Sequence, residues 1–209
     1  MVKYFLNFSA SKYQIKRAEI SKAINVTPKM FPEVLKDCAK ILKDVYGMEV
    51  SDVSENKNSS AFIVHAANSY GVSALQYPPD QRHEITLLFI ILSYIFMKNG
   101  DVQDMHLNQF LQQLNIDVQE PHKVFGEVGK LIKDKFPRQM YLKRSKVTIE
   151  GVNEAQIHLT WGVRAEKEFD KKEMLKAVAG IMNRSPVTFI NQYHEATQGE
   201  AVDEPMVLD

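Results

Sequence analysis

The sequence predicts a mostly α-helical fold of the α+β class, in which small β-hairpins follow groups of helices. A series of helical patterns that ends in two β-like segments occurs twice along the chain, and two further helical patterns follow the second pair. A helix-turn-helix unit that ends in a β-hairpin is a winged helix. We therefore expect tandem winged-helix domains plus C-terminal helices, and 209 residues are enough to give each domain a core.

Three helices and a hairpin are expected in the first half of the chain. The segment VKYFLNF is apolar from its start and no capping residue precedes it, so we expect a first helix there and a natural N-terminus that extends further. A second helix is expected over 16–24. The third follows Thr27-Pro28, keeps one apolar face and ends at Gly47. The expected strands are 48–53 and 61–66.

The second half repeats this order after a linker at 68–80 that contains glycine and proline. Its helices are expected at 85–97, 102–114 and 123–135, and its strands at 140–146 and 155–161. We expect Phe136-Pro137 to close the third helix, because proline seldom continues a helix.

Two more helices are expected after the second hairpin, at 171–182 and 187–196. Apolar spacing predicts that they turn inward Met174, Leu175, Val178, Ile181 and Met182 from the first, and Phe189, Ile190 and Tyr193 from the second. The acidic stretch after Gly199 is expected to be disordered. The expected domains are a first winged helix at 1–78, a second at 79–168, C-terminal helices packed on it at 169–198, and an acidic tail at 199–209.

Composition indicates an intracellular soluble protein. The 26 acidic and 26 basic residues cancel, so net charge identifies no partner. The single cysteine, Cys38, excludes an internal disulfide framework and is expected to serve packing alone. The apolar run at 85–97 is shorter than the ~20 residues that span a bilayer. It is better explained as a buried helix, on which Leu88, Ile91 and Ile95 share one face.

Positive charge is concentrated where the third helix of the second half meets its hairpin. Residues 121–147 contain eight basic side chains and two acidic ones, a local net charge of +6. Such a surface suits a polyanion. The side chains expected to grip DNA are Lys133, Lys135, Arg138, Lys143, Arg144 and Lys146. Contacts of this kind reach mostly phosphates, so binding should be weak, independent of sequence and sensitive to salt.

The sequence contains no pattern that predicts catalysis, a cofactor or a metal site. The six histidines lie far apart, without the HExxH spacing of a zinc enzyme. The segment Gly126–Lys130 lacks the spacing of a phosphate-binding loop and lies within an expected helix. No nucleophile and base can be paired by spacing, so we expect neither an enzyme nor a small-molecule substrate.

Several long segments resemble the MAGE homology domain. The matching stretches include LLFIILSYIFMKNG at 87–100, VFGEVGKLIKDKFPRQMYL at 124–142 and LTWGVRAEKE at 159–168. Further matches at 16–24 and 174–196 extend the resemblance over nearly the whole chain. Within the family the chain is most similar to the branch that supplies the third non-SMC element of the DNA-repair SMC complex.

The resemblance implies a tandem winged-helix fold without catalytic residues of its own. It also implies three partners: a RING-type ubiquitin ligase subunit, a kleisin subunit of an SMC complex, and double-stranded DNA. Family members contact the RING subunit through an apolar pair in the first helix, which corresponds here to Phe5 and Leu6. The family usually has two leucines there, so Phe5 keeps the apolar character but changes the shape. If this pair faces outward between the two winged helices, it forms a patch that a RING subunit can cover.

Three functions remain open from the sequence. The preferred one is a nuclear scaffold, possible also in the cytoplasm, that joins a RING subunit and a kleisin to DNA. The second is a ligase regulator that acts outside the SMC complex without DNA binding. The third is a sequence-specific winged-helix transcription factor. The third fits least well, because acidic and basic residues alternate on the outward face of the expected 123–135 helix and base-edge readout favours arginine, asparagine and glutamine.

Overall fold

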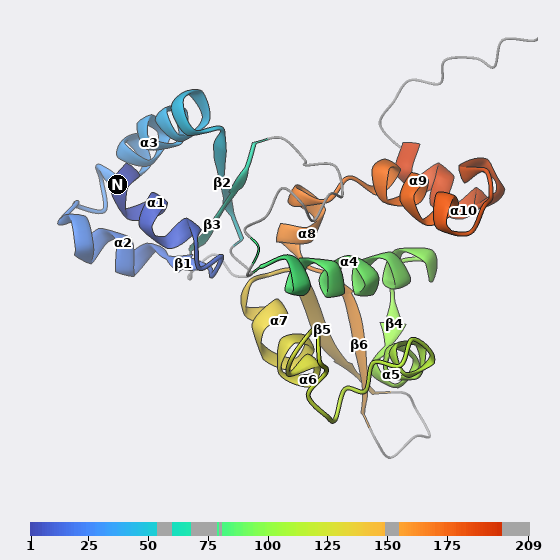
Figure 1. Ribbon diagram of the computed structural model, residues 1–209. Coiled ribbons are helices and arrows are strands. Elements are labelled where there is room, and N and C mark those ends of the chain that lie inside the picture. Colours follow the sequence, from blue (N-terminus) through green and yellow to red (C-terminus); the bar gives the residue numbers. More distant parts are fainter. Residues whose placement is uncertain (54–59, 68–78, 80, 149–154, 198–209) are drawn as a thin grey trace, which may run out of the picture.

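The computed structural model describes residues 1–53, 60–67, 79, 81–148 and 155–197. These residues form an N-terminal unit, residues 1–67, and a C-terminal unit, residues 81–197, each with a three-stranded antiparallel sheet (Figure 1). The mostly helical α+β class is as the sequence predicted. The acidic tail, both hairpin turns and most of the expected linker lie outside the described residues.

The N-terminal unit packs three helices against a small sheet. Its elements are α1 (Val2–Ser9), β1 (Ile15–Lys16), α2 (Arg17–Ile24), α3 (Phe31–Tyr46), β2 (Met48–Asp52) and β3 (Ala61–Ala66). The strand order is β1-β3-β2, so the expected hairpin is present and gains one short strand. The core gathers apolar side chains from every helix, among them Phe5, Ile20, Phe31 and Leu42.

The start of α3 differs from the prediction. Thr27-Pro28 do not begin the helix, which starts at Phe31. Instead, the carbonyl of Thr27 accepts the backbone N–H groups of Met30 and Phe31 in a turn, both at 3.1 Å. Pro32 supplies the proline of the first turn. The end is as predicted: Gly47 adopts the left-handed conformation at φ 62° that favours glycine.

The C-terminal unit begins with its most buried helix. Its elements before the C-terminal helices are α4 (Arg82–Met97), β4 (Val102–Gln103), α5 (Asp104–Gln113), α6 (Val128–Lys130), η2 (Leu131–Lys135), α7 (Phe136–Arg138), β5 (Leu142–Val147) and β6 (Gln156–Trp161). The prediction for α4 is confirmed, since Leu88, Ile91 and Ile95 have no exposed surface. Among the described residues no helix is long and apolar enough to span a membrane.

The helix expected over 123–135 is displaced along the chain. It starts at Val128, because His122 and Gly126 exchange two backbone hydrogen bonds of 2.8 Å that close a tight turn before it. It also passes through Pro137 and ends at Arg138, so the expected stop at Phe136-Pro137 is wrong. A π-helical turn, η2, widens the helix just before the proline. The helix therefore tolerates a residue that has no N–H to donate.

Within residues 162–197, three helices rather than two follow the second hairpin. They are α8 (Val163–Glu168), α9 (Lys171–Ile181) and α10 (Ile190–Thr197), the last preceded by a 3₁₀ turn, η3 (Pro186–Thr188). The predicted helix at 187–196 is thus split by η3, which changes the phase of the face that points inward. Gln192 is buried, whereas Ile190 and Tyr193 are exposed. Ile181 and Met182 are also exposed, so their predicted burial is wrong.

Candidate nucleic-acid and partner interfaces

In the basic region at 121–147, strand β5 is tied to the helix through the backbone carbonyl of Lys133, which has no regular α-helical hydrogen-bond partner. In a regular α-helix the carbonyl of Lys133 would accept the N–H of residue 137, but that residue is proline. Nη1 of Arg144 donates to this carbonyl at 3.3 Å. Arg144 therefore ties β5 to the helix at η2, and the sequence pattern that reveals it is the proline four residues after Lys133.

The six basic residues predicted to bind DNA fall into two groups. Lys135 is paired with Glu84 at 2.6 Å, Arg138 is paired with Asp134 at 2.8 Å, and Arg144 makes the carbonyl contact just described. The other three, Lys133, Lys143 and Lys146, are exposed and make no ion pair within the described part of the chain. These three lysines carry the charge that is free to meet a phosphate.

The strand β5 divides the predicted cluster between two faces of the sheet. Successive strand residues point to opposite sides. Three residues therefore share the face that meets the helix: Leu142, which is buried, Arg144 and the exposed Lys146. Lys143 lies on the other face. Because β5 is an edge strand, its last residues are open on one side. We call Lys133, on the helix, and Lys146, on the strand face that meets it, the helix-side pair; Lys143 lies on the opposite face of the sheet.

The first helix presents its apolar residues differently from the expectation. Phe5 is fully buried in the core of the N-terminal unit, so the condition that both residues of the pair face outward is not met. It occupies the centre of the buried face of α1. Leu6 lies on one flank and is half-buried. On the other flank Phe8 is exposed and contacts Tyr4, with the rings tilted by 32° and their centroids 4.6 Å apart.

The two units are joined by a buried arginine that the sequence did not single out. Arg164, in α8, donates to main-chain carbonyls of the N-terminal unit: Nη1 to Val64 at 2.6 Å and Nη2 to Lys12 at 2.9 Å. Within its own unit it donates through Nε to the carbonyl of Gln139 at 2.8 Å and pairs with Glu168. Arginine and glutamate four residues apart usually mark a solvated helix face, so the sequence carried no sign of burial.

Side chains from both units complete this junction. The hydroxyl of Tyr141 donates to Glu168, and Nζ of Lys12 donates to the Tyr141 hydroxyl at 2.9 Å. Burial lowers the pKa of Lys12. Two clefts flank the junction, one of about 610 Å³ beside His65 and one of about 330 Å³ beside Glu84. These contacts position the two units, and within the described ranges no three His, Cys, Asp or Glu side chains could together hold a metal ion.

Comparisons with known proteins agree over almost the entire chain. Residues 1–70 and 62–172 match the MAGE homology domain. The chain is 31% identical to the non-structural maintenance of chromosomes element 3 homolog of Mus musculus over 202 residues. This matched region covers 96% of this chain and 71% of that protein. A chain of the solved Nse1-Nse3-Nse4 complex has a TM-score of 0.81 at 28% identity and covers 94% of this chain and 93% of that chain.

Other relatives are much longer than the matching region. Trophinin of Homo sapiens is 28% identical over 201 residues, which are 96% of this chain and 14% of that protein. Melanoma-associated antigen D2 of Homo sapiens is 26% identical over 201 residues, which are 96% of this chain and 32% of that protein. What these proteins share with the chain is one domain, and the match to that domain extends through both units. The chain therefore belongs to the MAGE homology domain family.

Proposed function

We propose that this chain is a non-catalytic scaffold that joins a RING ubiquitin-ligase subunit and a kleisin subunit to DNA in a nuclear SMC-type DNA-repair complex. The observation that carries the proposal is the likeness of both units, in one arrangement, to a chain of the Nse1-Nse3-Nse4 complex. The 31% identity to the element 3 homolog, over nearly the same span, supports the same assignment. We interpret the two units as winged helices, since each has helices followed by a three-stranded sheet that ends in a hairpin.

The complex itself gives the first test. Co-expression of the chain with the RING and kleisin subunits of the same species should yield one ternary species on size-exclusion chromatography with light scattering. Separate elution of all three chains, with this chain folded by circular dichroism, would refute the scaffold.

DNA should bind through the helix-side pair, Lys133 and Lys146. Reversing both charges (Lys133→Glu with Lys146→Glu) should abolish binding of a fluorescent duplex measured by anisotropy. Reversing Lys143 alone should weaken binding less, because it lies across the sheet. Arg144 is left unchanged, since it tethers β5 to the helix. If all three lysines meet phosphates in the unaltered chain, affinity should fall roughly 40-fold between about 50 and 200 mM salt.

A matched control has the same change in net charge on the other unit. Lys22 and Lys29 are exposed in the N-terminal unit, and their reversal to Glu should leave DNA binding unchanged. Equal losses in both double variants would mean that only overall charge matters. Unchanged binding in the Lys133 and Lys146 variant would disprove the site.

The RING subunit should contact the flank of α1 that carries Leu6, while Phe5 supports that helix from the core. Leu6→Ala should weaken capture of the RING subunit by tenfold or more without lowering the melting temperature greatly, as for an interface anchor. Phe5→Ala should instead cost about 3–5 kcal/mol of stability, as for a buried aromatic. A Leu6→Ala chain that captures the RING subunit normally would exclude this contact.

A second function is favoured by the breadth of the similarity. Trophinin and melanoma-associated antigen D2 match over the same 96% of the chain. A ligase regulator outside the SMC complex would bind a RING protein but neither kleisin nor DNA, and the two experiments above distinguish it. A sequence-specific transcription factor is disfavoured, because Arg138 and Lys130 on the helix are paired with Asp134 and Glu127 and are less available to base edges.

A further inference from the structure

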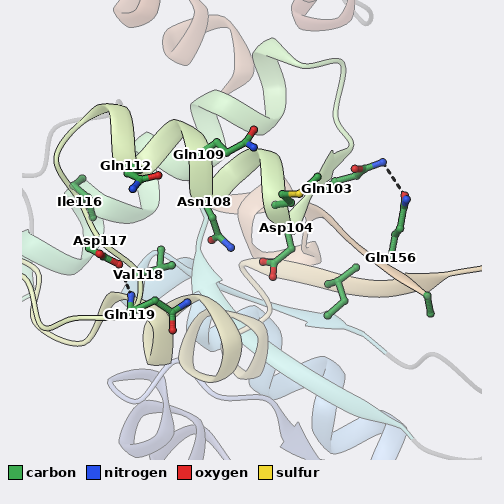
Figure 2. Close-up of a pocket in the computed structure, with 13 residues that line it drawn as sticks. Gln103, Asp104, Asn108, Gln109, Gln112, Ile116, Asp117, Val118, Gln119 and Gln156 are labelled. Atoms are coloured by element: carbon green, nitrogen blue, oxygen red, sulfur yellow. Dashed lines mark hydrogen bonds between the residues drawn. The ribbon is translucent and has the colours of Figure 1, made fainter. Parts of the chain in front are cut away.

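A groove of about 630 Å³ opens on the C-terminal unit; none of its lining residues belongs to the junction or to the helix-side pair, but Ile157 in its lining is the cross-strand partner of Lys146. The groove lies between α5, the loop at 116–119 and the start of β6 (Figure 2). Asp104 and Asn108 point into it from α5, and Gln119 faces them from the loop. On one side its wall is fixed by a hydrogen bond of 2.8 Å between the side chains of Gln103 and Gln156.

The charge of the lining has one sign. Two carboxylates, of Asp104 and Asp117, line the groove, and among the described residues no lysine or arginine does. The remaining polar side chains are neutral amides, which can donate and accept. A polyanion would meet uncompensated negative charge here. The lining therefore suits a cation, and it borders the surface proposed for DNA where Ile157 pairs with Lys146 in the sheet.

One carboxylate oxygen of the lining residue Asp104 is buried without a donor. The Oδ1 atom of Asp104 has less than 1 Å² of accessible surface and no hydrogen-bond partner in the described chain. A buried charged oxygen that lacks a donor is costly, and such groups are rare in folded proteins. The carboxylate of Asp117, by contrast, already accepts the backbone N–H of Gln119 at 2.7 Å. Asp104 is thus the carboxylate with an unused acceptor.

Aliphatic side chains form the rest of the lining. Ile116, Val118 and Ile157 contribute apolar wall, and Met105 stands exposed at the groove. A ligand matched to this lining has an apolar stem and a cationic end that carries several donors. The arginine side chain has that form, with three methylene groups and five N–H donors in a planar fork.

We infer that this groove binds an arginine side chain of a partner polypeptide, with the guanidinium donating to Asp104 and to the amide oxygens of Asn108 and Gln119. The stem packs against the aliphatic wall. The partner is recognised by a side chain rather than by an added strand, because the lining donors and acceptors are side chains. The inference is independent of the DNA and RING contacts proposed above.

The test uses the full chain labelled with ¹⁵N and two short peptides. N-acetyl-Gly-Arg-Gly-amide should shift the amide signals of Asp104, Asn108 and Ile157. The same peptide with citrulline, which has the shape of arginine but no charge, should not. Asp104→Asn keeps the side-chain shape and should weaken the arginine peptide about tenfold. Glu120→Gln, an exposed carboxylate that does not line the groove, is the matched control and should bind as the unaltered chain.

Several results would overturn the site. They are no shifts at millimolar arginine peptide, equal shifts from the citrulline peptide, or unchanged binding by the Asp104→Asn chain. A single-stranded dinucleotide that shifts the same signals while the arginine peptide does not would reassign the groove to nucleic acid. Signals elsewhere in the Asp104→Asn spectrum should match the unaltered chain, which shows that the variant is folded.

Discussion

Nη1 of Arg164 lies 2.9 Å from Oε1 of Glu168, and 1% and 8% of these two side chains are exposed. A buried ion pair of this kind adds little stability over apolar packing, yet loss of one partner leaves a charge stranded away from water. Here the arginine also satisfies three main-chain carbonyls, two of them in the other unit. The pair therefore specifies how the two units dock.

Replacing Arg164 by Ala should destabilise the chain by about 3–5 kcal/mol, because Glu168 stays buried and the carbonyls lose their donor. Asp134 and Arg138 have the same spacing on an exposed surface, and Arg138→Ala should cost about 0–1 kcal/mol. Urea unfolding followed by circular dichroism measures both. Similar costs for the two variants would show that burial at the junction is unimportant.

Replacing Gly162 by Ala should also destabilise the chain. A Cβ there would lie 2.2 Å from the carbonyl oxygen of Met140, where the chain entering β5 crosses the corner between β6 and α8. Relief of that overlap requires backbone movement, at roughly 1–3 kcal/mol. Gly180→Ala, in α9 with open space around it, should instead stabilise by about 0.5–1 kcal/mol. Thermal melts of both variants measure these changes in stability. An unchanged melting temperature for Gly162→Ala would contradict the close approach of the Met140 carbonyl.

Truncation of Leu88 to Ala should cost about 2–5 kcal/mol, since this residue lies in the middle of the largest core and has no exposed surface. Ile181→Ala, whose side chain is 79% exposed, should change stability by no more than ~0.5 kcal/mol. Denaturant midpoints with unchanged slopes would report this difference directly. A Leu88→Ala chain that unfolds like the unaltered protein would place α4 outside the core.

The single thiol gives a prediction about pH. Burial raises the pKa of Cys38. At any pH near or below the ordinary pKa of a thiol, the folded chain therefore holds less thiolate than the unfolded chain. Iodoacetamide should label it far more slowly in buffer at about pH 8 than in denaturant, where an ordinary thiol titrates near 8.5. Mass spectrometry of the alkylated chain measures the two rates. Equal rates would mean that the thiol is accessible in the fold.

Elements with a strong local pattern could be predicted from the sequence. The four strands of the two hairpins and the buried face of α4 follow from apolar period and turn residues. The strands β1 and β4 could not be predicted, because two residues carry no period and each strand pairs with a hairpin strand far away in the sequence. The shift of the 123–135 helix depended on a tight turn at His122–Gly126 and a π-helical turn before Pro137.

The sites were predictable in composition but not in geometry. The sequence locates the six basic residues expected to bind DNA, yet their division between ion pairs and free lysines depends on Glu84 and Asp134. Phe5 and Leu6 are neighbours in sequence, and only the rotation of α1 against its core decides which is buried. The proposed arginine groove joins α5 to a strand some fifty residues later, which no local pattern reveals.

The way Arg164 reaches across to the N-terminal unit has a consequence for how the two halves can diverge. Its acceptors there are the carbonyls of Val64 and Lys12, groups that every amino acid possesses. The docking contact therefore constrains the path of the chain at these two positions and not the identity of their side chains. Relatives can replace the residues at 12 and 64 while the docking geometry persists, whereas position 164 itself has no equivalent substitute, because lysine offers no planar fork to serve three carbonyls at once.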